Sequence, residues 1–209
     1  LLNQVNEIIA ELKTDGTLDD LKKRWFKSDL SPYEELNLKL PEKGEPLVIG
    51  TSATREPFCF VNAKQEVSGH DGELARILAI RLNRPAVFKD MKFAALIPAL
   101  QSGKVDIIIA GMTATDERRK SVNFSESYFT NSQVIIVKKP KSEIAALKAP
   151  SKKLRTLDDI KDKKIALLMG STHDTWAKEN LPDAVIMQFK SPSEILLAVK
   201  SGKADAAIY

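Results

Sequence analysis

The sequence predicts an α/β fold made of two related lobes, and two observations support this prediction. From Leu47 onward, short apolar runs alternate with helical segments, which is typical of parallel-sheet lobes with helices on both faces. In addition, residues 97–110 (IPALQSGKVDIIIA) and 196–209 (LLAVKSGKADAAIY) share a pattern of apolar helix, Ser-Gly-Lys turn and apolar strand. One repeat at a spacing of about one hundred residues indicates a duplicated lobe rather than a solenoid.

The N-terminal part predicts two helices and a linker. The apolar residues of 1–12 share one helical face, and the Thr-Asp-Gly sequence at 14–16 ends that helix. Thr17 is a good N-cap for a second helix that reaches Trp25. Residues 27–46 are polar and contain prolines and a glycine, so they are expected to form a linker.

The first lobe is expected over residues 47–137. Its elements follow from apolar runs of strand length and from apolar residues at helical spacing. In chain order they are a strand at 47–51, a helix at 73–82, a strand at 85–88, a helix at 93–101, and strands at 105–110 and 134–137.

A lysine- and proline-containing segment, residues 138–155, is expected to be the hinge or crossing between the lobes. The second lobe is then expected over residues 156–209, as an incomplete lobe. Its elements are a short helix capped by Thr156, a strand at 164–168, a helix opened by 170–172, a strand at 184–187, a helix at 193–200 and a strand at 204–208.

Composition excludes several classes of protein. The 209 residues carry a net charge of +4, without the basic stripe and interleaved aromatics of a nucleic-acid-binding protein. No apolar run is long enough to predict a transmembrane helix. No signal-peptide pattern opens the chain, so an export signal would have been removed or would lie outside it. Cys59, the only cysteine, is interpreted as a small core residue.

Enzyme and metal signals are weak. His70 and His173, the only histidines, lie in no metal-ligand spacing and are interpreted as surface or capping residues. The sequence contains no nucleophile elbow, phosphate-binding glycine loop or dinucleotide fingerprint. The acidic pair at 116–117 is more typical of a helix start than of acid–base catalysis. We therefore expect no enzyme activity, no metal and no cofactor.

Two loops are candidates for ligand binding. In an open α/β sheet, ligands bind at the carboxyl ends of the strands, where residues 111–119 and 170–174 follow predicted strands. Each loop offers glycine, hydroxyl groups and a helix N-terminus that attracts anions. Taken alone, each loop is best explained as a helix cap. Their occurrence in two similar lobes favours a ligand clamped between them.

Four segments carry a family resemblance: EPFCF at 56–60, GHDGELA at 69–75, FAALIPALQSGKVDIIIAGMTATDERRKSVNFSESY at 93–128 and GST at 170–172. Through them, residues 47–209 resemble the first three quarters of a type II periplasmic solute-binding protein of family 3, which binds polar amino acids for ABC importers. The resemblance implies capture of an amino acid or similar zwitterion by hinge closure. It also implies delivery to an ABC permease and a periplasmic or lipid-anchored location.

The resemblance also assigns roles to individual residues. Arg118 would hold the ligand α-carboxylate, helped by Thr113 and by the backbone of Gly111. Phe93 would contact the ligand side chain. Ser171 and Thr172 would form the helix start of the second lobe that closes on the carboxylate.

The sequence departs from the family pattern at three places. Ser52 stands where the family often has aspartate, and Arg55 where it often has an aromatic residue. Arg55 would favour an acidic or carbonyl-rich ligand side chain if it pointed into the cleft, and would be a solvated charge if it pointed outward. The family also supplies an aspartate for the ligand ammonium just after a strand like the one at 204–208, and this chain ends at Tyr209.

Residues 1–26 resemble the helices that close the C-terminus of the same family, yet here they come first. Either the chain spans the junction of two tandem binding domains, or the fold is circularly permuted. In both cases the apolar face of 1–26 needs cover, so we expect it to dock on the first lobe of its own chain or of a neighbour. The remaining alternatives for the whole are a sensor domain of a larger envelope protein and a dehydratase-like enzyme.

Overall fold

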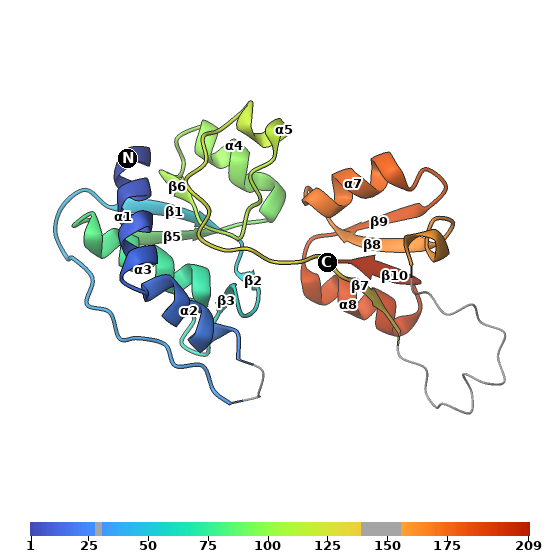
Figure 1. The fold of residues 1–209 in the computed structure, drawn as a ribbon, viewed down its shortest axis with the longest axis horizontal. Helices are drawn as coiled ribbons and strands as arrows, with labels where there is room; N and C mark the ends of the chain where they lie inside the picture. Colours follow the sequence, from blue (N-terminus) through green and yellow to red (C-terminus); the bar gives the residue numbers. More distant parts are fainter. Residues whose placement is uncertain (28–30, 139–155) are drawn as a thin grey trace. The chain divides into compact units, whose positions relative to one another are not determined.

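A computed structural model describes residues 1–27, 31–138 and 156–209 of the chain (Figure 1). The chain divides into two compact units, Leu1–Thr130 (unit 1) and Asn131–Tyr209 (unit 2). Both combine strands with helices, which confirms the α/β prediction. Most of the predicted hinge, residues 139–155, lies outside the described residues, so that assignment stays a prediction.

Unit 1 is built on a parallel sheet with strand β1 (Leu47–Thr51) at its centre. Strands β5 (Ala86–Asp90) and β6 (Ile107–Ile108) flank it on either side. Ile49 lies opposite Phe88 on one side and Ile107 on the other. Leu47 and Ile49 are fully buried, as the apolar run at the start of this segment predicts for a strand covered on both faces.

Helices follow the strands of unit 1 as expected, with small shifts in their ends. The helix predicted at 73–82 is α3 (His70–Arg81), which begins earlier because Gly69 can adopt a φ of 104°. A side chain at Gly69 would place its Cβ only 2.5 Å from the carbonyl oxygen of Phe58, so glycine is required there. The other helical elements are η1 (Phe93–Ala95), α4 (Leu96–Gln101) and the single turn α5 (Asp116–Arg119).

A second, smaller sheet in unit 1 was not expected from the sequence. It consists of β2 (Thr54–Arg55), β3 (Cys59–Val61) and β4 (Val67–Ser68), which pair in antiparallel order. Strands of two or three residues are too short to show an alternating pattern, so this sheet left no periodic signal.

Cys59 in β3 is a core residue, as predicted. Its side chain is almost fully buried, and its Sγ lies 2.9 Å from Oγ1 of Thr51 in β1. Burial raises the pKa of the Cys59 thiol to about 12, because the thiolate would lose its hydration. The thiol is therefore protonated, and unreactive as a nucleophile, throughout the neutral range.

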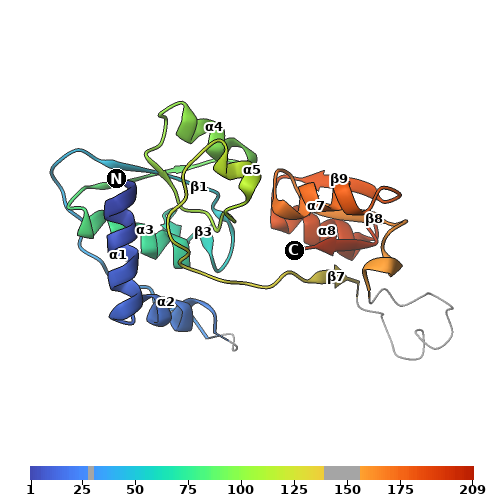
Figure 2. The same cartoon turned by 45° about the horizontal axis from the view of Figure 1, so that its top comes forward.

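The predicted N-terminal helices are present as α1 (Leu2–Thr14) and α2 (Thr17–Trp25), and both lie beside α3 (Figures 1 and 2). Their buried side chains join the core of unit 1, which also contains Leu47, Ile49, Leu74 and Leu78. Residues 1–26, called the arm below, therefore dock on the first lobe of their own chain. The predicted N-cap at Thr17 is wrong: Gly16 caps α2 at a φ of 84°, and the Thr17 amide donates to the Asp15 carboxylate instead.

A buried ion pair fastens the arm to α3. Arg24 donates from Nη2 to Oε1 of Glu73 at 2.6 Å and from Nη1 to Oε2 at 3.0 Å. The Trp25 indole N–H donates to the same carboxylate at 3.0 Å. The Glu73 side chain is 0% exposed and the Arg24 side chain 11%. The hydrogen bonds to Glu73 raise the pKa of Arg24 above its ordinary value, so the guanidinium remains charged at neutral pH.

Unit 2 contains a four-stranded sheet in the order β7-β10-β8-β9. Its strands are β7 (Ile135–Val137), β8 (Lys164–Leu168), β9 (Val185–Phe189) and β10 (Ala206–Ile208). Its helical elements are η2 (Leu157–Asp159), capped by Thr156 as predicted, α7 (Thr172–Asn180) and α8 (Pro192–Ser201). Helices α7 and α8 lie on opposite faces of this sheet (Figure 1), as an α/β lobe requires.

One predicted boundary is wrong. Residues up to 137 were expected in the first lobe, yet β7 pairs antiparallel with β10 and belongs to unit 2. Backbone hydrogen bonds between Val134 and Tyr209, at 2.8 and 2.9 Å, extend this pairing. The sheet is therefore mixed, with one antiparallel and two parallel pairs of strands. The prediction failed because an apolar run alone indicates neither the partner of a strand nor its direction.

We predict that Glu73→Gln lowers the free energy of unfolding of unit 1 by about 2 kcal/mol, because it removes the buried counter-charge of Arg24 and leaves only the exposed Asp20 carboxylate, 2.6 Å from Nε. Urea unfolding would measure the loss. The matched control is Glu11→Gln, which removes another bond between the arm and α3, the 2.8 Å pair with Arg81, whose side chains are 60% and 41% exposed. That control should change stability by less than about 0.5 kcal/mol. Equal effects would contradict the account.

We also predict that the Cys59 thiol does not react with a thiol-specific disulfide reagent at pH 8 in the native protein. The folded-state pKa of about 12 keeps the thiol protonated there, and burial excludes the reagent. In denaturant the same thiol should react completely within minutes. Rapid stoichiometric labelling of the native protein would show that β3 is not packed as described.

Candidate functional site

The loop at residues 111–119 follows β6 and contains the first group of predicted ligand residues. Thr115 caps α5, since its hydroxyl accepts a hydrogen bond from the Arg118 amide at 3.2 Å. The capping interpretation of this loop is therefore correct for Thr115. This cap uses only the backbone amide of Arg118, so the side chain of Arg118 has no part in it.

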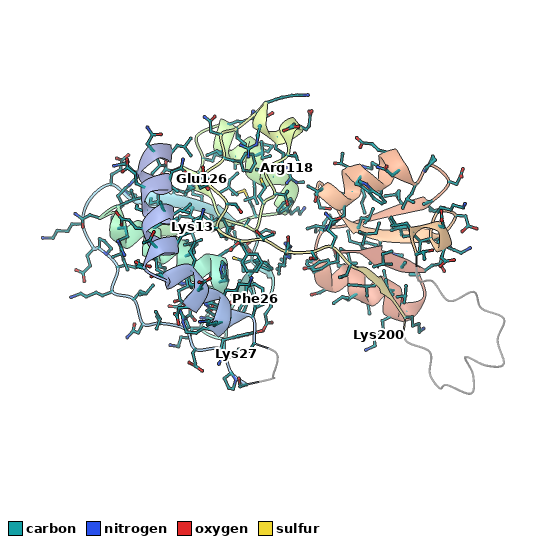
Figure 3. The ribbon with its side chains drawn as sticks, in the orientation of Figure 1. Lys13, Phe26, Lys27, Arg118, Glu126 and Lys200 are labelled. Atoms are coloured by element: carbon teal, nitrogen blue, oxygen red, sulfur yellow. The ribbon has the colours of Figure 1, made fainter. Side chains whose placement is uncertain are left out.

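Arg118 lies folded back across its own loop. Its Nη1 donates to the carbonyl oxygen of Thr113 at 2.8 Å, and its Cζ lies 5.5 Å from the centroid of the Phe93 ring. Burial lowers the pKa of Arg118 from its ordinary value, although a guanidinium remains charged at neutral pH. The structure thus brings together three of the residues predicted for the site, with a half-buried cation between a loop and an aromatic ring. Figure 3 labels Arg118 in α5.

Gly111 begins this loop with a φ of 55°. Its amide donates to the Tyr128 hydroxyl at 3.3 Å, and that hydroxyl donates to Oδ2 of Asp71 at 3.2 Å. The other oxygen of Asp71 lies 3.0 Å from Nδ1 of His70. The Gly111 N–H thus has a partner within the protein, and the predicted contact between the Gly111 backbone and a ligand carboxylate stays a prediction.

Tyr128 was not singled out from the sequence as a site residue. Burial and then the charge of Asp71 raise the pKa of Tyr128 well above its ordinary value, so its phenol stays protonated. It therefore acts as a hydrogen-bonding link between the loop and α3. Its position late in the FSESY segment of the family resemblance is the one sequence signal that pointed to it.

Arg55 lies beside Gly111 rather than standing in solvent. Its Nη1 would be 3.4 Å from a Cβ built on Gly111, and its Cζ lies 4.6 Å from the centroid of the Phe58 ring. The side chain therefore lies beside the loop, and its role towards a ligand stays a prediction. Ser52 is buried in the turn after β1, where its carbonyl accepts from the Thr54 amide.

An aromatic cluster packs against Arg55 through the Phe58 ring. It comprises Phe26, Phe58, His70, Tyr128 and Phe129. The ring centroids of Phe26, Phe58 and Phe129 lie 4.7–4.8 Å apart, and the imidazole stacks on Tyr128 at 6.0 Å. Phe26, labelled in Figure 3, is the first residue after α2, so the arm supplies one wall of the cluster.

The surface or capping interpretation of His70 is wrong. Its side chain is fully buried in the aromatic cluster, and its Nε2 makes no hydrogen bond. The sequence missed this because the arm that covers His70 is distant along the chain. His173, in contrast, is half-buried in the first turn of α7.

The corresponding loop of unit 2 opens α7. Ser171 is its N-cap, and the hydroxyl accepts from the Asp174 amide at 3.2 Å. The buried carboxylate of Asp174 accepts from the Gly170 amide at 3.0 Å and from the Gln188 side chain at 2.6 Å. Thr172, the first helical residue, is half-buried. The capping interpretation of this loop assigned the helix start to Thr172, and the structure places the cap itself one residue earlier, at Ser171. The ligand role of Ser171 and Thr172 stays a prediction.

The described residues also bear on metal binding and on membrane insertion. Within residues 1–27, 31–138 and 156–209, no group of three or more His, Cys, Asp or Glu side chains is arranged to hold a metal ion. In the same ranges, no helix combines the length and apolarity needed to span a bilayer.

Comparisons with known proteins agree with this architecture. The chain is 32% identical over 161 residues to the ABC transporter arginine-binding protein 1 of Escherichia coli, covering 77% of this chain and 61% of that protein. It is 31% identical over 167 residues to the ABC transporter glutamine-binding protein GlnH of Bacillus subtilis, covering 78% of this chain and 57% of that protein. The chain thus spans about three fifths of the length of these curated relatives.

Solved structures give the same result. An ancestral arginine-binding protein bound to arginine superposes with a TM-score of 0.71 at 38% identity, covering 79% of this chain and 70% of that one. The ancestral amino acid-binding protein AncCDT-1, a precursor of cyclohexadienyl dehydratase, also gives a TM-score of 0.71, at 35% identity, covering 92% and 73%. Residues 47–173 match the family described as bacterial extracellular solute-binding proteins, family 3. This chain belongs to that family.

Proposed function

We propose that this protein captures an amino acid or similar small zwitterion outside the cytoplasm, by hinge closure, for import through an ABC permease. The observation that supports this most directly is the position of Arg118, held between Thr113 and Phe93 at the end of β6. The family, and relatives named as arginine- and glutamine-binding proteins, support the same proposal.

The chemistry of Arg118 suits a ligand carboxylate. A guanidinium offers parallel N–H donors that match both oxygens of a carboxylate, and such charge-assisted bonds are stronger than neutral ones. Because the Thr113 carbonyl and the Phe93 ring already hold the side chain, less rotamer entropy remains to be lost on binding. The exposed Thr113 hydroxyl would add a donor, and Phe93 would contact the apolar part of the ligand side chain.

Unit 2 would contribute the start of α7. Helix N-termini favour anions because their first amides lack intrahelical partners. We assign Thr172 and the cap residue Ser171 to this role, with Ser171 acting through the helix start because its hydroxyl is already bonded to the Asp174 amide.

We propose that the protein is not an enzyme. His70, Asp71 and Tyr128, beside the start of the loop, are bonded to one another, and the raised pKa of Tyr128 makes it unsuitable as a general base. Within the loop, Asp116 and Glu117 are exposed in the first turn of α5, and Glu117 pairs with Lys120 at 2.8 Å. The likeness to a dehydratase precursor keeps an enzyme as the second candidate. Dehydration of prephenate-like acids by the purified protein would establish that alternative.

The location and partners follow from the proposed import role. We place the protein in the periplasm or anchored to the cell envelope, with a membrane permease as its partner and no nucleic acid. The docking of the arm on unit 1 is compatible with both a tandem junction and a circular permutation, and also with a sensor domain of a larger envelope protein. Whether a permease or a kinase gene adjoins its own would separate importer from sensor.

We predict that Arg118→Ala abolishes amino-acid binding by the full-length protein, with an affinity loss of at least about 100-fold, while the protein stays folded. Titration calorimetry against the best ligand from a thermal-shift screen of amino acids would measure it. The matched control is Arg119→Ala, since Arg119 is the exposed neighbour that lies over Phe124 instead. Unchanged affinity in Arg118→Ala would refute the proposed role of this loop.

A further inference from the structure

We infer that residues 31–40, called the clasp below, keep the arm on its own chain and prevent it from docking on a second copy of the protein. This role concerns the arm and does not depend on any ligand. The sequence predicts a linker at residues 27–46, and residues 31–46 indeed form no regular helix or strand. The segment nevertheless lies against unit 1 as it returns beside the arm towards β1 (Figure 1).

The clasp contacts the arm at the residues of the buried ion pair. The Glu34 carbonyl oxygen accepts a hydrogen bond from Nη1 of Arg24 at 2.8 Å. The Tyr33 ring centroid lies 5.0 Å from that of Trp25. Lys27, labelled in Figure 3, donates from Nζ to Oε1 of Glu34 at 2.6 Å. These contacts join the clasp to the end of α2.

The clasp also contacts the body of unit 1, meaning residues 47–130. The Ser68 hydroxyl in β4 donates to Oε2 of Glu35 at 2.9 Å. The Tyr33 ring centroid lies 6.0 Å from that of Phe60 in β3. Two further clasp residues pack against the buried core: Leu38 and Leu40. The clasp is therefore attached both to the arm and to the body that the arm covers.

Chain length explains how these contacts restrict the arm. Between Phe26 and the first clasp residue stand only residues 27–30, which can span at most about 18 Å. An arm on so short a connection cannot travel to another molecule. If the clasp is released as far as Leu38, the connection can span up to about 40 Å. The arm can then leave its own α3 and remake the same contacts on the α3 of a second copy.

The surface under the arm is suited to the arm of a second copy. It contains the buried Glu73 carboxylate, which accepts hydrogen bonds from both Arg24 and Trp25. A buried charge of this kind is favourable only while it is paired and hydrogen-bonded. Buried side chains of α1 and α2 complete the same core. Because another copy carries an identical arm, its arm reproduces this whole set of contacts.

The polar contacts of the clasp are more exposed than the ion pair beneath it. The Glu34 side chain is 72% exposed and the Glu35 side chain 33%, compared with 0% for Glu73. Exposed polar pairs contribute little to the stability of a fold. The main effect of the clasp is therefore on where the arm docks, and only a small effect on the stability of unit 1 is expected.

Exchange of arms between copies tests this inference. Affinity-tagged and untagged full-length protein are mixed, and the untagged chain retained on the affinity resin is measured over days. The native protein should retain none above background. The double variant Tyr33→Ala, Glu35→Ala, which releases the clasp as far as Leu38, should retain at least about ten times more. The matched control, Leu36→Ala with Lys39→Ala, changes two exposed clasp residues and should behave as the native protein does.

Hydrogen exchange separates this role from a general effect on stability. The amides of α2 and the indole N–H of Trp25 should exchange at least about tenfold faster in the double variant, because the arm opens more often. The amides of β1, at the centre of the sheet of unit 1, should keep their native rates. The second tryptophan, Trp176 in α7 of unit 2, provides the reference indole signal.

Three outcomes would overturn the inference. If native copies exchange arms as readily as the double variant does, the clasp does not keep the arm on its own chain. If the double variant exchanges no arms between copies, residues 31–40 are a passive linker. If the amides of β1 and α2 exchange faster by the same factor, Tyr33 and Glu35 only stabilise unit 1 as a whole.

Discussion

The buried ion pair between Arg24 and Glu73 is the interaction on which the rest of unit 1 depends. Removing two charges from water is unfavourable by several kcal/mol per ion unless they remain paired and hydrogen-bonded. With the Trp25 indole bonded to the same carboxylate, α2 therefore has one favourable position on α3. That position carries Phe26 into the aromatic cluster, directly against Phe58 and Phe129. The pairing of Arg24 with Glu73 thus determines where the arm packs on the core of unit 1.

The aromatic cluster connects the docked arm to the residues of the candidate site. Phe58 supports the Arg55 guanidinium, while Tyr128 joins the Gly111 amide to Asp71. The arm also holds the segment that contains Tyr128, because the Glu126 amide donates to the Asn6 side chain and Lys22 lies over Phe129. The candidate site is consequently packed and hydrogen-bonded on the side of Arg55 and Gly111. Its other end, at Arg118, depends on the loop's own bond to Thr113 and on Phe93.

Sequence reasoning succeeded where a pattern was long or repeated. The strand at 47–51, the apolar face of α1 and the duplicated Ser-Gly-Lys unit each extended over enough residues to define the element and the lobe. It failed where structure depends on contacts between distant segments. The strands β2–β4 are too short to show periodicity. The apolar run of β7 does not indicate which strand it pairs with. The burial of His70 depends on Phe26, which comes from the arm. Arg118 and Thr113 were predicted from family resemblance, whereas the orientation of Arg55 needed the structure.

The most direct test of the central claim is a titration of the ¹⁵N-labelled full-length protein with the amino acid that stabilises it most in a thermal-shift screen, followed by NMR. Saturable shifts should concentrate in the backbone amides of Thr113 and Arg118 and in the Nε–H signals of Arg55 and Arg118. The amides of α1, remote from the loop in sequence and held in the core, should shift little. Saturable shifts confined to other parts of unit 1, or no shifts with any amino acid at millimolar concentration, would contradict the account.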